Sequence, residues 1–488
     1  MQYSFDTSVQ ELKHRVLKEI ARLEFDGHLL EGMFTIPQTI VPGPEPTMRC
    51  CIYKERAIVG ERIHTNIRGS RGAENVVEVL QIACDECPVS QMTVGDACRG
   101  CIAHRCANAC PKDAIEIRTV EGSHVQKAHI DSKKCVLCGR CTDVCPYNAI
   151  VKNVRPCEHA CKAGAITMDD DMKAAIDDEK CIACGACVYA CPFGAIVDRS
   201  DMRNVIRLLK RSDGGSRHRM YAVVAPAIAS QFQKIPLGKV VAGIKALGFD
   251  SVVEAALGAD MVAYRESEEL VEKGFLTSSC CPAFVAHVEK HFPELKEHIS
   301  SNPSPMVAIA EYLKESDPEA KVVFIGPCVA KKAEAKKDRV KKYIDGVLTF
   351  EEMVAMFAAR ELDLESLEEV SLDNASYYGR IFARSGGVAE AVGQALKERG
   401  SHEDFEYNPI SCSGVDECRV ALMKASKGLL KNNFIEGMAC VDGCIGGAAS
   451  LTHGPKDRKQ VDLYGKESKE QTIMDAVSVL GLVKKQKL

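Results

Sequence analysis

The sequence lacks several features that mark common classes of protein. No apolar run approaches the ~18–20 residues that a membrane-spanning helix needs. Residues 1–7 hold no charged start followed by an apolar stretch, so no secretory signal is visible and we expect a cytoplasmic chain. The glycine pair Gly386-Gly387 lacks the GxGxxG pattern of dinucleotide-binding domains, so no motif for a nicotinamide or flavin cofactor is visible. Tryptophan is also absent, and nothing in the sequence explains this.

Charge and length set further limits. The net charge of −5 gives no indication of nucleic-acid binding. With 488 residues and a hydrophobic fraction of 46%, the chain is an ordinary globular protein that is too long for a single core. We expect about two to four domains.

Cysteine, in contrast, is abundant. The chain has 25 cysteines. Disulfides are disfavoured in the cytoplasm, so clustered thiols should bind metal, and thiolate-rich sites select zinc or iron–sulfur clusters. Most of the cysteines lie in a repeated pattern between Cys84 and Cys191, and a second, non-repeating set follows at Cys280-Cys281, Cys328, Cys440 and Cys444.

The first set contains an internal repeat. Four copies of one short sequence motif, each ending in Ala-Ile, begin at Cys110, Cys145, Cys161 and Cys191. In each copy another cysteine lies four positions upstream, at Cys106, Cys141, Cys157 and Cys187. Four half-units imply two ferredoxin-like modules in tandem.

The spacing also predicts which cysteines share a cluster. Cys135-x2-Cys138-x2-Cys141-x3-Cys145-Pro is the bacterial ferredoxin run, in which three thiolates hold one cubane and the fourth reaches the neighbouring cluster. Zinc is the alternative, but it rarely uses such a run. The predicted sets are Cys98, Cys101, Cys106 and Cys145; Cys135, Cys138, Cys141 and Cys110; and Cys181, Cys184, Cys187 and Cys161.

A fourth accessory cluster is a separate hypothesis. After the other sets are assigned, Cys157 and Cys191 remain, and a cubane bound by them would need two more thiolates. The orphan pair Cys84-x2-Cys87 has the right form to complete them. The alternative is that Cys84 and Cys87 are a structural thiol pair, which leaves three accessory clusters.

The remaining patterns predict the organisation of the chain. Residues 8–24 have the periodicity of an amphipathic helix, 37–47 carry four prolines and predict an extended connector, and 211–217 predict a flexible linker. Beyond the linker, strands are expected at 221–225 and 321–325 and helices at 236–247 and 259–273. We therefore expect an α+β multidomain protein, with an N-terminal helical and extended region over 1–80, an iron–sulfur region over 81–200 and an α/β domain over 220–488.

Three short blocks hold the second set of cysteines. They are Leu276-Thr-Ser-Ser-Cys280-Cys281-Pro-Ala-Phe284, then Ile325-Gly-Pro-Cys328-Val-Ala-Lys331-Lys332-Ala-Glu334, and then Glu436-Gly-Met438-Ala-Cys440-Val-Asp-Gly-Cys444-Ile-Gly-Gly447. Four thiolates from three distant loops can hold one more cubane, next to a second cofactor between two lobes.

These blocks resemble the three signature motifs of the iron-only (iron–iron) hydrogenases. The resemblance covers about residues 220–480, and the cysteine-rich front half looks like the accessory region of the multi-cluster members. The whole resembles the group B branch. It implies tandem ferredoxin-like modules with 4Fe-4S clusters, followed by a two-lobed α/β H-cluster domain.

The resemblance also implies a cofactor and roles for individual residues. The H-cluster of this family is a cubane joined through one cysteine to a diiron unit that carries CO, cyanide and a bridging dithiolate amine. By motif, the cubane ligands would be Cys281, Cys328, Cys440 and Cys444, with Cys444 as the bridge. Cys280 would pass protons, Lys331 would donate to an iron cyanide, and Met438 and Pro226 would contact the diiron unit.

Protons must reach such a buried site through titratable groups. Glu266, Glu269 and Lys273 lie near one face of a predicted helix and align with the proton path of the family, and Ser300 matches its hydroxyl step. The alternative is a solvated, salt-bridged helix face.

The sequence departs from the common pattern at several places around the pocket. Two serines, Ser278 and Ser279, precede the cysteines instead of one, and Phe284 replaces a tryptophan. Ala227, Met306 and Gly326 also replace other residue types near the diiron unit. Such changes tune potential and reactivity and leave the reaction class intact.

The leading hypothesis is an enzyme that interconverts protons, electrons and H₂. The resemblance implies ferredoxin as the redox partner and maturation proteins for the diiron unit. A hydrogen sensor or an iron–sulfur scaffold without fast turnover is the alternative. Cys280 argues against the sensor, and Lys331, Met438 and Glu334 in their motif places argue against the scaffold. Cys50, Cys51, Cys412 and Cys418 remain unassigned, as structural thiols or a metal or redox pair.

Overall fold

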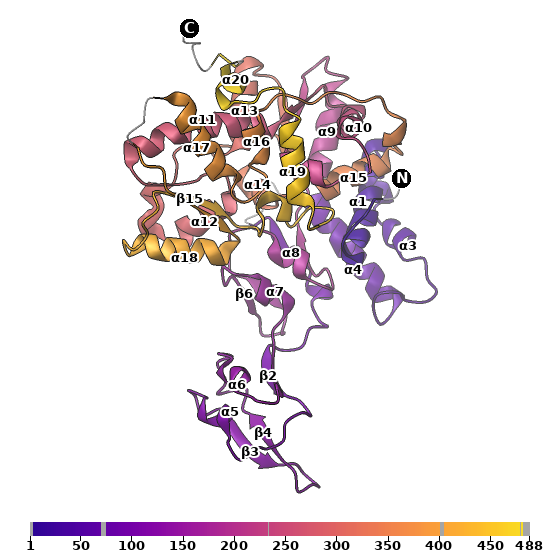
Figure 1. Ribbon diagram of the computed structural model, residues 1–488. Coiled ribbons are helices and arrows are strands. Elements are labelled where there is room, and N and C mark those ends of the chain that lie inside the picture. Colours follow the sequence, from indigo (N-terminus) through magenta and orange to yellow (C-terminus); the bar gives the residue numbers. More distant parts are fainter. Residues whose placement is uncertain (1–2, 70–74, 233, 401–404, 479, 482–488) are drawn as a thin grey trace.

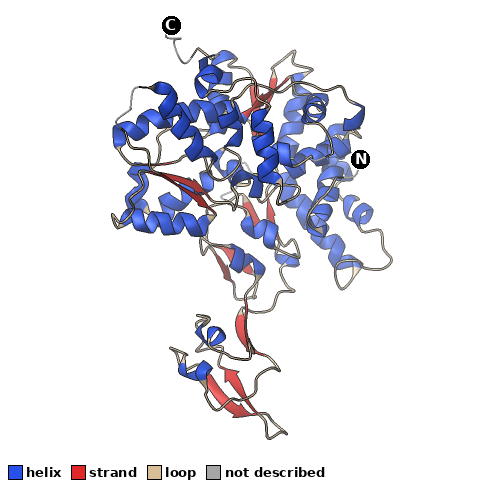
Figure 2. Ribbon diagram, viewed as in Figure 1, coloured by secondary structure: helices blue, strands red, loops and turns tan. Residues whose placement is uncertain are grey.

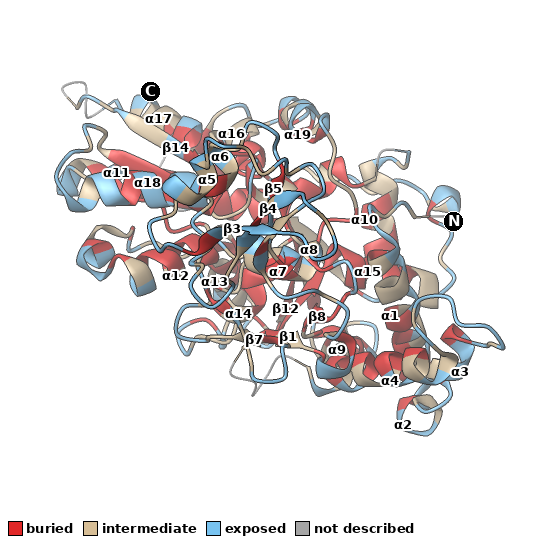
Figure 3. Ribbon diagram, turned by 90° about the horizontal axis from the view of Figure 1, so that it is seen from below, coloured by how far each residue is buried: buried red, intermediate tan, exposed pale blue. Residues whose placement is uncertain are grey.

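The computed structural model describes residues 3–69, 75–232, 234–400, 405–478 and 480–481. The chain forms a helix-rich body and a narrow cysteine-rich arm that extends from it (Figures 1 and 2). Among the described residues, none of the helices combines the length and apolarity needed to cross a bilayer. Figure 3 shows that buried residues are concentrated in the body, whereas strand β3 of the arm is largely exposed.

The N-terminal helix belongs to the body. Helix α1 (Ser8–Asp26) confirms the expected helix, and the hydroxyl of Thr7 caps it by accepting the N–H of Gln10 at 3.2 Å. Val16, Leu17 and Ile20 lie in the same hydrophobic core as the larger sheet of the body. The other helices of this region are α2 (Leu29–Gly32), α3 (Ile36–Ile40) and α4 (Ile52–Arg68).

Two expectations about connecting segments need correction. The proposed extended connector is helical over 37–40, where Pro37 lies in the first turn of α3 and a helix tolerates proline, whereas residues 41–47 form neither helix nor strand. The proposed flexible linker begins inside α9 (Met202–Ser212), and Arg217 then donates its N–H to the carbonyl of Ser212. Gly215 packs closely against Asp250, so this segment is an ordered turn.

The arm contains the two predicted ferredoxin-like modules, and the first is inserted into the second. The distal module consists of antiparallel pairs β2–β5 and β3–β4 and helices α5 and α6, and the proximal module consists of pairs β1–β8 and β6–β7 and helices α7 and α8. The elements are β1 (Val77–Val79), β2 (Gln91–Val94), α5 (Arg105–Asn108), β3 (Ile115–Thr119), β4 (Gln126–Ile130), α6 (Arg140–Asp143), β5 (Ile150–Asn153), α7 (Pro156–Ala160), β6 (Ile166–Met168), β7 (Ala174–Ile176), α8 (Ala186–Ala190) and β8 (Ile196–Asp198).

The rest of the body has two lobes, each built on a parallel sheet. The four-stranded sheet has the order β10-β9-β12-β13, and the three-stranded sheet has the order β11-β15-β14. Their strands are β9 (Met220–Val224), β10 (Ser251–Glu254), β11 (Leu276–Thr277), β12 (Lys321–Gly326), β13 (Gly346–Thr349), β14 (Pro409–Ser413) and β15 (Phe434–Met438). Strands β9 and β12 confirm the two predicted strands.

Helices cover both sheets, as parallel strands require. Helices α10 and α11 confirm the two expected helices of this region. The set is α10 (Leu237–Ala246), α11 (Ala255–Lys273), α12 (Pro282–His291), α13 (Pro305–Ser316), α14 (Ala330–Glu334), α15 (Phe350–Ala359), α16 (Tyr377–Ile381), α17 (Gly387–Arg399), α18 (Val415–Ser426), α19 (Asp457–Lys466) and α20 (Ile473–Ser478).

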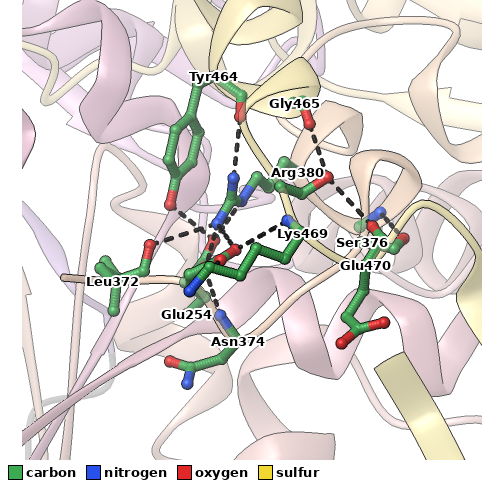
Figure 4. A network of polar contacts seen from close by, with 12 residues as sticks. Glu254, Leu372, Asn374, Ser376, Arg380, Tyr464, Gly465, Lys469 and Glu470 are labelled. Carbon is green, nitrogen blue, oxygen red and sulfur yellow. Dashed lines mark hydrogen bonds and ion pairs between the residues drawn. The ribbon is translucent and has the colours of Figure 1, made fainter. Parts of the chain in front are cut away.

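A buried ion pair anchors the start of α11. Arg380 of α16 donates two hydrogen bonds, of 2.8 and 2.9 Å, to the carboxylate of Glu254, which also accepts the hydroxyl of Tyr464 at 2.6 Å (Figure 4). Arg380 is 1% exposed, so the pair is removed from water. Three helices, α11, α16 and α19, are thereby joined at one point.

The cysteine blocks of the body all lie at the carboxyl ends of parallel strands. Each block begins inside a strand, and its cysteines follow the end of that strand: β11 for the first block, β12 for the second and β15 for the third. Pro226 follows β9. Ligand sites in open parallel sheets gather at these ends. Segments that are far apart in the sequence are thus brought to the junction of the two lobes.

Candidate functional site

The cysteines of the arm gather in groups of four. One cavity of about 20 Å³ is lined by Cys98, Cys101, Cys106 and Cys145. A second cavity of about 20 Å³ is lined by Cys110, Cys135, Cys138 and Cys141. A third, of about 650 Å³, is lined by Cys161, Cys181, Cys184 and Cys187 and continues to Cys440 of the body. Each group has the composition that the spacing predicts.

Cys84, Cys87, Cys157 and Cys191 form a fourth group. Burial raises the pKa of Cys157 to about 11, and the nearby thiols of Cys191, Cys84 and Cys87 add to the rise. The pairing of β1 with β8 brings Cys84 and Cys87 to Cys191, because Val79 lies opposite Ile196. The distal module lies between β1 and β8 in the sequence. Cys84 and Cys87 are therefore far from Cys157 and Cys191 along the chain, although they lie near them in space.

The grouping favours a cluster over a single ion. Each group supplies four cysteine thiols, most of them at the spacing of the bacterial ferredoxin run, and four cysteine thiolates are the ligands of a 4Fe-4S cubane. The donor set therefore fits iron–sulfur clusters better than zinc.

The four copies of the repeated sequence motif have the same local structure. In each copy the alanine N–H donates to the thiol four residues earlier, from Ala114 to Cys110 at 3.3 Å, Ala149 to Cys145 at 3.4 Å, Ala165 to Cys161 at 3.2 Å and Ala195 to Cys191 at 3.2 Å. The residue before each alanine has a left-handed backbone, which Asp113, Asn148, Gly164 and Gly194 tolerate. Hydrogen bonds to cluster sulfurs are one of the factors that set a reduction potential.

The four cysteines at the lobe junction lie within electrostatic reach of one another. Burial raises the pKa of Cys328 to about 11 and that of Cys444 to about 12, and in both cases the thiol of Cys281 adds to the rise. Cys440 is affected in the same way by Cys328, Cys281 and Cys444. Buried thiols of this kind need a cation to become thiolates, so this donor set fits the cubane that the sequence predicts.

The site also contains a buried cation. Lys331 donates from Nζ to Glu334 at 2.7 Å and to the carbonyl oxygen of Cys280 at 3.3 Å. Burial opposes its charge, but Glu334 outweighs this effect and raises the pKa of Lys331. Met438, 2% exposed, ends β15, and Pro226 begins the 3-10 helix Pro226–Ser230 after β9.

A chain of polar side chains leads from this site toward solvent. Glu269 accepts the hydroxyl of Ser300 at 2.9 Å and pairs with Lys273 at 2.7 Å, and Lys273 is exposed. Deeper in the body, Glu266 accepts both the N–H and the hydroxyl of Ser279 at 3.2 Å. These residues therefore form two hydrogen-bonded groups in and near the interior, Ser279 with Glu266 and Ser300 with Glu269 and Lys273, and not only a solvated helix face.

The two acidic residues differ in their protonation. Burial raises the pKa of Glu266 to about 7, against the hydrogen bonds that Ser279 donates to it, and one of its oxygens, Oε2, has no hydrogen-bond partner. Glu269 is also penalised by burial, but Lys273 and the N–H of Ser301 lower its pKa. A polar cavity of about 360 Å³, lined by Ser279, Ser300 and Glu334, adjoins both groups.

Several departures from the common motif have a structural explanation. Ser278 accepts the N–H of Gly437 at 3.1 Å and joins two strands, whereas Ser279 binds Glu266, so the two serines have separate roles. Phe284 lies against Gly437, where a Cβ atom would approach its ring to 2.2 Å. The sequence did not predict the Ser279–Glu266 contact, and the doubled serine was the only sign of it.

Comparison with known proteins identifies the body and the arm separately. The domain described as "Iron only hydrogenase large subunit, C-terminal domain" matches residues 218–448, and 4Fe-4S dicluster domains match 97–149 and 127–192. Iron hydrogenase 1 of Clostridium pasteurianum is 30% identical over 388 residues, which cover 68% of this chain and 66% of that protein. The chain thus spans just under two thirds of this relative's length.

Two further similarities are more limited. The cytosolic Fe-S cluster assembly factor NAR1 of Kluyveromyces lactis is 38% identical over 94 residues, 19% of this chain and 20% of that protein. A structure of a variant of the FeFe-hydrogenase HydA1 of Chlamydomonas reinhardtii aligns with a TM-score of 0.47 at 21% identity, over 57% of this chain and 93% of that chain. The domain matches and the clostridial relative show that the chain belongs to the iron-only hydrogenase family.

Proposed function

We propose that this chain catalyses 2 H⁺ + 2 e⁻ ⇌ H₂ and exchanges the electrons with ferredoxin. The observation that carries the proposal is the junction of the two lobes, where four partly buried thiols lie near Cys280 and the Lys331–Glu334 pair. A line of cysteine groups reaches this junction from the arm, and a line of acidic and hydroxyl side chains reaches it from solvent.

The donor set fits the cofactor of the family. Cys281, Cys328, Cys440 and Cys444 would hold the cubane of the H-cluster, with Cys444 as the bridge to the diiron unit. When bound, the H-cluster supplies the metal centre at which protons and electrons are converted to H₂. Lys331 would hold a positive charge toward an anionic ligand of that centre, and Met438 and Pro226 would bound the pocket.

The protein side chains manage the proton. Cys280 is buried and its pKa is raised well above the usual value by burial and by Glu266, so the thiol holds its proton until an acceptor is bound. Glu266, with a pKa of about 7, can both accept and release a proton near neutral pH. Ser300, Glu269 and Lys273 continue the route to the surface.

Electrons would pass through the cysteine groups of the arm. Cys184 of the proximal module interacts electrostatically with Cys281, and Cys440 with Cys184, so the module adjoins the proposed H-cluster ligands. The distal module lies at the far end of the arm from the body (Figure 1). Four accessory clusters, including the Cys84 group, would form the path.

The distal module has the surface expected for an acidic electron carrier. Ile102, Val136 and Tyr147, which are 97%, 56% and 51% exposed, lie within or next to its cysteine loops. Exposed cations occur in and near the same cysteine loops, namely Arg99, Arg105, Lys112, Lys133, Lys134 and Arg140. This basic, apolar surface in a chain of net charge −5 suits a ferredoxin that carries negative charge.

The test is anaerobic H₂ evolution after the diiron cofactor has been supplied, with iron counted in the same sample. We expect turnover, exchange of deuterium gas with water protons, and roughly 22 iron per chain from four accessory cubanes and the H-cluster. With Lys133→Glu and Lys134→Glu, the KM for reduced ferredoxin should rise, while the rate with a small viologen dye stays unchanged. An iron-loaded chain with neither turnover nor exchange would refute the enzyme proposal.

The local similarity to NAR1 favours one second candidate, an iron–sulfur assembly role without turnover. An assembly protein would bind iron but show no infrared bands of CO and cyanide after loading. A hydrogen sensor would show the bands with little turnover.

A further inference from the structure

Two glycines occupy equivalent places in the two modules. Gly139 follows Cys138 and Gly185 follows Cys184, and each begins a short helix with a left-handed backbone, at φ +83° and +80°. Left-handed backbone favours glycine at both positions. Their surroundings differ, however, and the difference is not explained by the cysteine motif.

Only Gly185 is pressed against another part of the chain. A Cβ atom at Gly185 would lie 2.8 Å from Cγ2 of Val329 and 3.0 Å from Cβ of Ala448. A Cβ atom at Gly139 would meet nothing within 4 Å. Gly185 therefore lets the backbone of the proximal module approach the body more closely than any side chain would allow.

The partners of Gly185 belong to the H-cluster loops. Val329 directly follows Cys328 and is 1% exposed, and Ala448 lies four residues after Cys444. On the other side of the contact, Ile182 and Cys184 share a small apolar core with Cys281 and Cys328. The contact thus lies between the groups that would hold the last accessory cluster and the cubane.

We propose that Gly185 is a positioning residue that sets the distance between the Cys161, Cys181, Cys184 and Cys187 group and the cubane ligands of the body. The inference rests on the proposed function, because it concerns the last electron-transfer step into the H-cluster. Electron tunnelling weakens steeply with distance, so a side chain at this position separates the two centres and slows that step. Gly139, which faces open space, has no such role.

The test compares Gly185→Ala with the matched variant Gly139→Ala in the iron-loaded enzyme. Both variants carry the same left-handed backbone penalty, but only the first introduces a clash. Three readouts are needed: iron content, the magnetic coupling between neighbouring reduced clusters by electron paramagnetic resonance, and ferredoxin-linked H₂ evolution compared with deuterium exchange. Deuterium exchange takes place at the active site alone and needs no electron from the arm.

We expect Gly185→Ala to keep its iron and its deuterium exchange but to lose magnetic coupling. Ferredoxin-linked turnover should fall relative to deuterium exchange, because the electron must tunnel over a longer distance to reach the H-cluster. Gly139→Ala should behave like the parent. Adding Val329→Ala to Gly185→Ala removes the closest clash and should restore part of the coupling.

The outcomes separate the inference from the proposed function. Parent-like coupling and turnover in Gly185→Ala would overturn the positioning role. A parent enzyme without deuterium exchange would refute the hydrogenase proposal, while the coupling measurement would still test the spacing. If Gly185→Ala does not load with iron, Ala448→Val adds bulk to the same contact from the body and leaves the cysteine loop unchanged; parent-like coupling in that variant would likewise overturn the role.

Discussion

Cys280 and Glu266 influence each other inside the body without a direct hydrogen bond. The charge of Glu266 is among the causes that raise the pKa of Cys280, and Oε2 of Glu266 has no hydrogen-bond partner. Orphaned buried oxygens are costly and are usually satisfied by a ligand or by water. The arrangement therefore favours a proton relay over a purely structural pair.

Replacing Cys280 by alanine should separate cofactor binding from turnover. Cys280→Ala removes the proposed inner proton donor but none of the proposed cubane ligands, so bound iron should stay unchanged while H₂ turnover falls by about 10²- to 10⁴-fold. Cys412→Ala, which removes a buried thiol of 1% exposure outside the site, is the matched control. Near-normal turnover of Cys280→Ala would remove Cys280 from the proton path.

Glu266 should make stability depend on pH in a defined direction. The raised pKa of about 7 means that the folded chain binds a proton at this group where the unfolded chain does not, between its ordinary value of 4.5 and about pH 7. Relative to its value below pH 4.5, the free energy of unfolding therefore falls by roughly 3 kcal/mol as the pH rises through 7, because the buried carboxyl group must then lose its proton.

The thermal midpoint of Glu266→Gln should therefore exceed that of the parent at pH 8 by more than it does at pH 5. Turnover of this variant should fall by about 10²- to 10⁴-fold, because glutamine cannot accept the proton. Glu272→Gln, an exposed change on the same helix, should leave both properties unchanged. An equal shift of the Glu266→Gln midpoint at both pH values would contradict the raised pKa.

At the scale of elements, the pairing of β1 with β8 decides where Cys84 and Cys87 lie. Cys84→Ala should lower bound iron by roughly four atoms, one cubane, and leave the distal groups loaded. Cys50→Ala, which removes an exposed thiol, should lose no iron. Iron analysis of both variants is the measurement, and full iron in Cys84→Ala would leave three accessory clusters.

The Arg380–Glu254 pair decides how α11, the helix of the proposed proton path, is held. Arg380→Met leaves the carboxylate of Glu254 buried without its cation, and such a change costs about 3–5 kcal/mol of stability. Chemical or thermal unfolding should show the loss. Adding Glu254→Gln removes the uncompensated charge and should recover part of it, whereas additive losses in the double variant would mean that the two residues do not interact.

At the scale of the whole molecule, a buried charge network joins the arm to the body and to the N-terminal helix within the body. Lys332 of α14 contacts Asp198 of β8 at 2.8 Å and Glu352 of α15 at 2.9 Å. Lys13 of α1 contacts Asp198 and Glu351, both at 2.5 Å. Lys332 directly follows Lys331, so the network holds the second cysteine block against the proximal module.

Lys332→Met should cost about 3–5 kcal/mol, because it leaves Asp198 and Glu352 with less compensation. Lys341→Met breaks an exposed Lys–Asp pair of 2.7 Å and should cost less than about 1 kcal/mol. Unfolding measurements on the two variants give the comparison. Similar losses in both would show that the buried network is not stabilising.

The stability that the same network contributes depends on pH. Burial raises the pKa of Asp198, but Lys13 and Lys332 outweigh burial and hold it well below its usual range. Its contribution is therefore present above the unfolded value of about 3.9 and is lost as the pH falls through the folded one. Lys332→Met should reduce this acid-dependent loss.

The cluster ligands could be predicted from the sequence because most of each set is local. Three of the four cysteines in a ferredoxin run lie within a few residues, and the crossing of the fourth follows from the repeat. The insertion of one module into the other could not be predicted in this way. It depends on β1 and β8, two three-residue strands that are separated by the whole distal module.

The sequence by itself determined the chemistry of this protein: the number and type of thiol donors, the repeat of the arm and the residues of the three blocks. These depend on residue types at short spacings, which the chain carries in any conformation. Only the tertiary structure decided that the carboxyl ends of two sheets meet, that Glu266 titrates near neutral pH and that Gly185 touches Val329. Proximity and burial arise when distant segments pack, so no local pattern contains them.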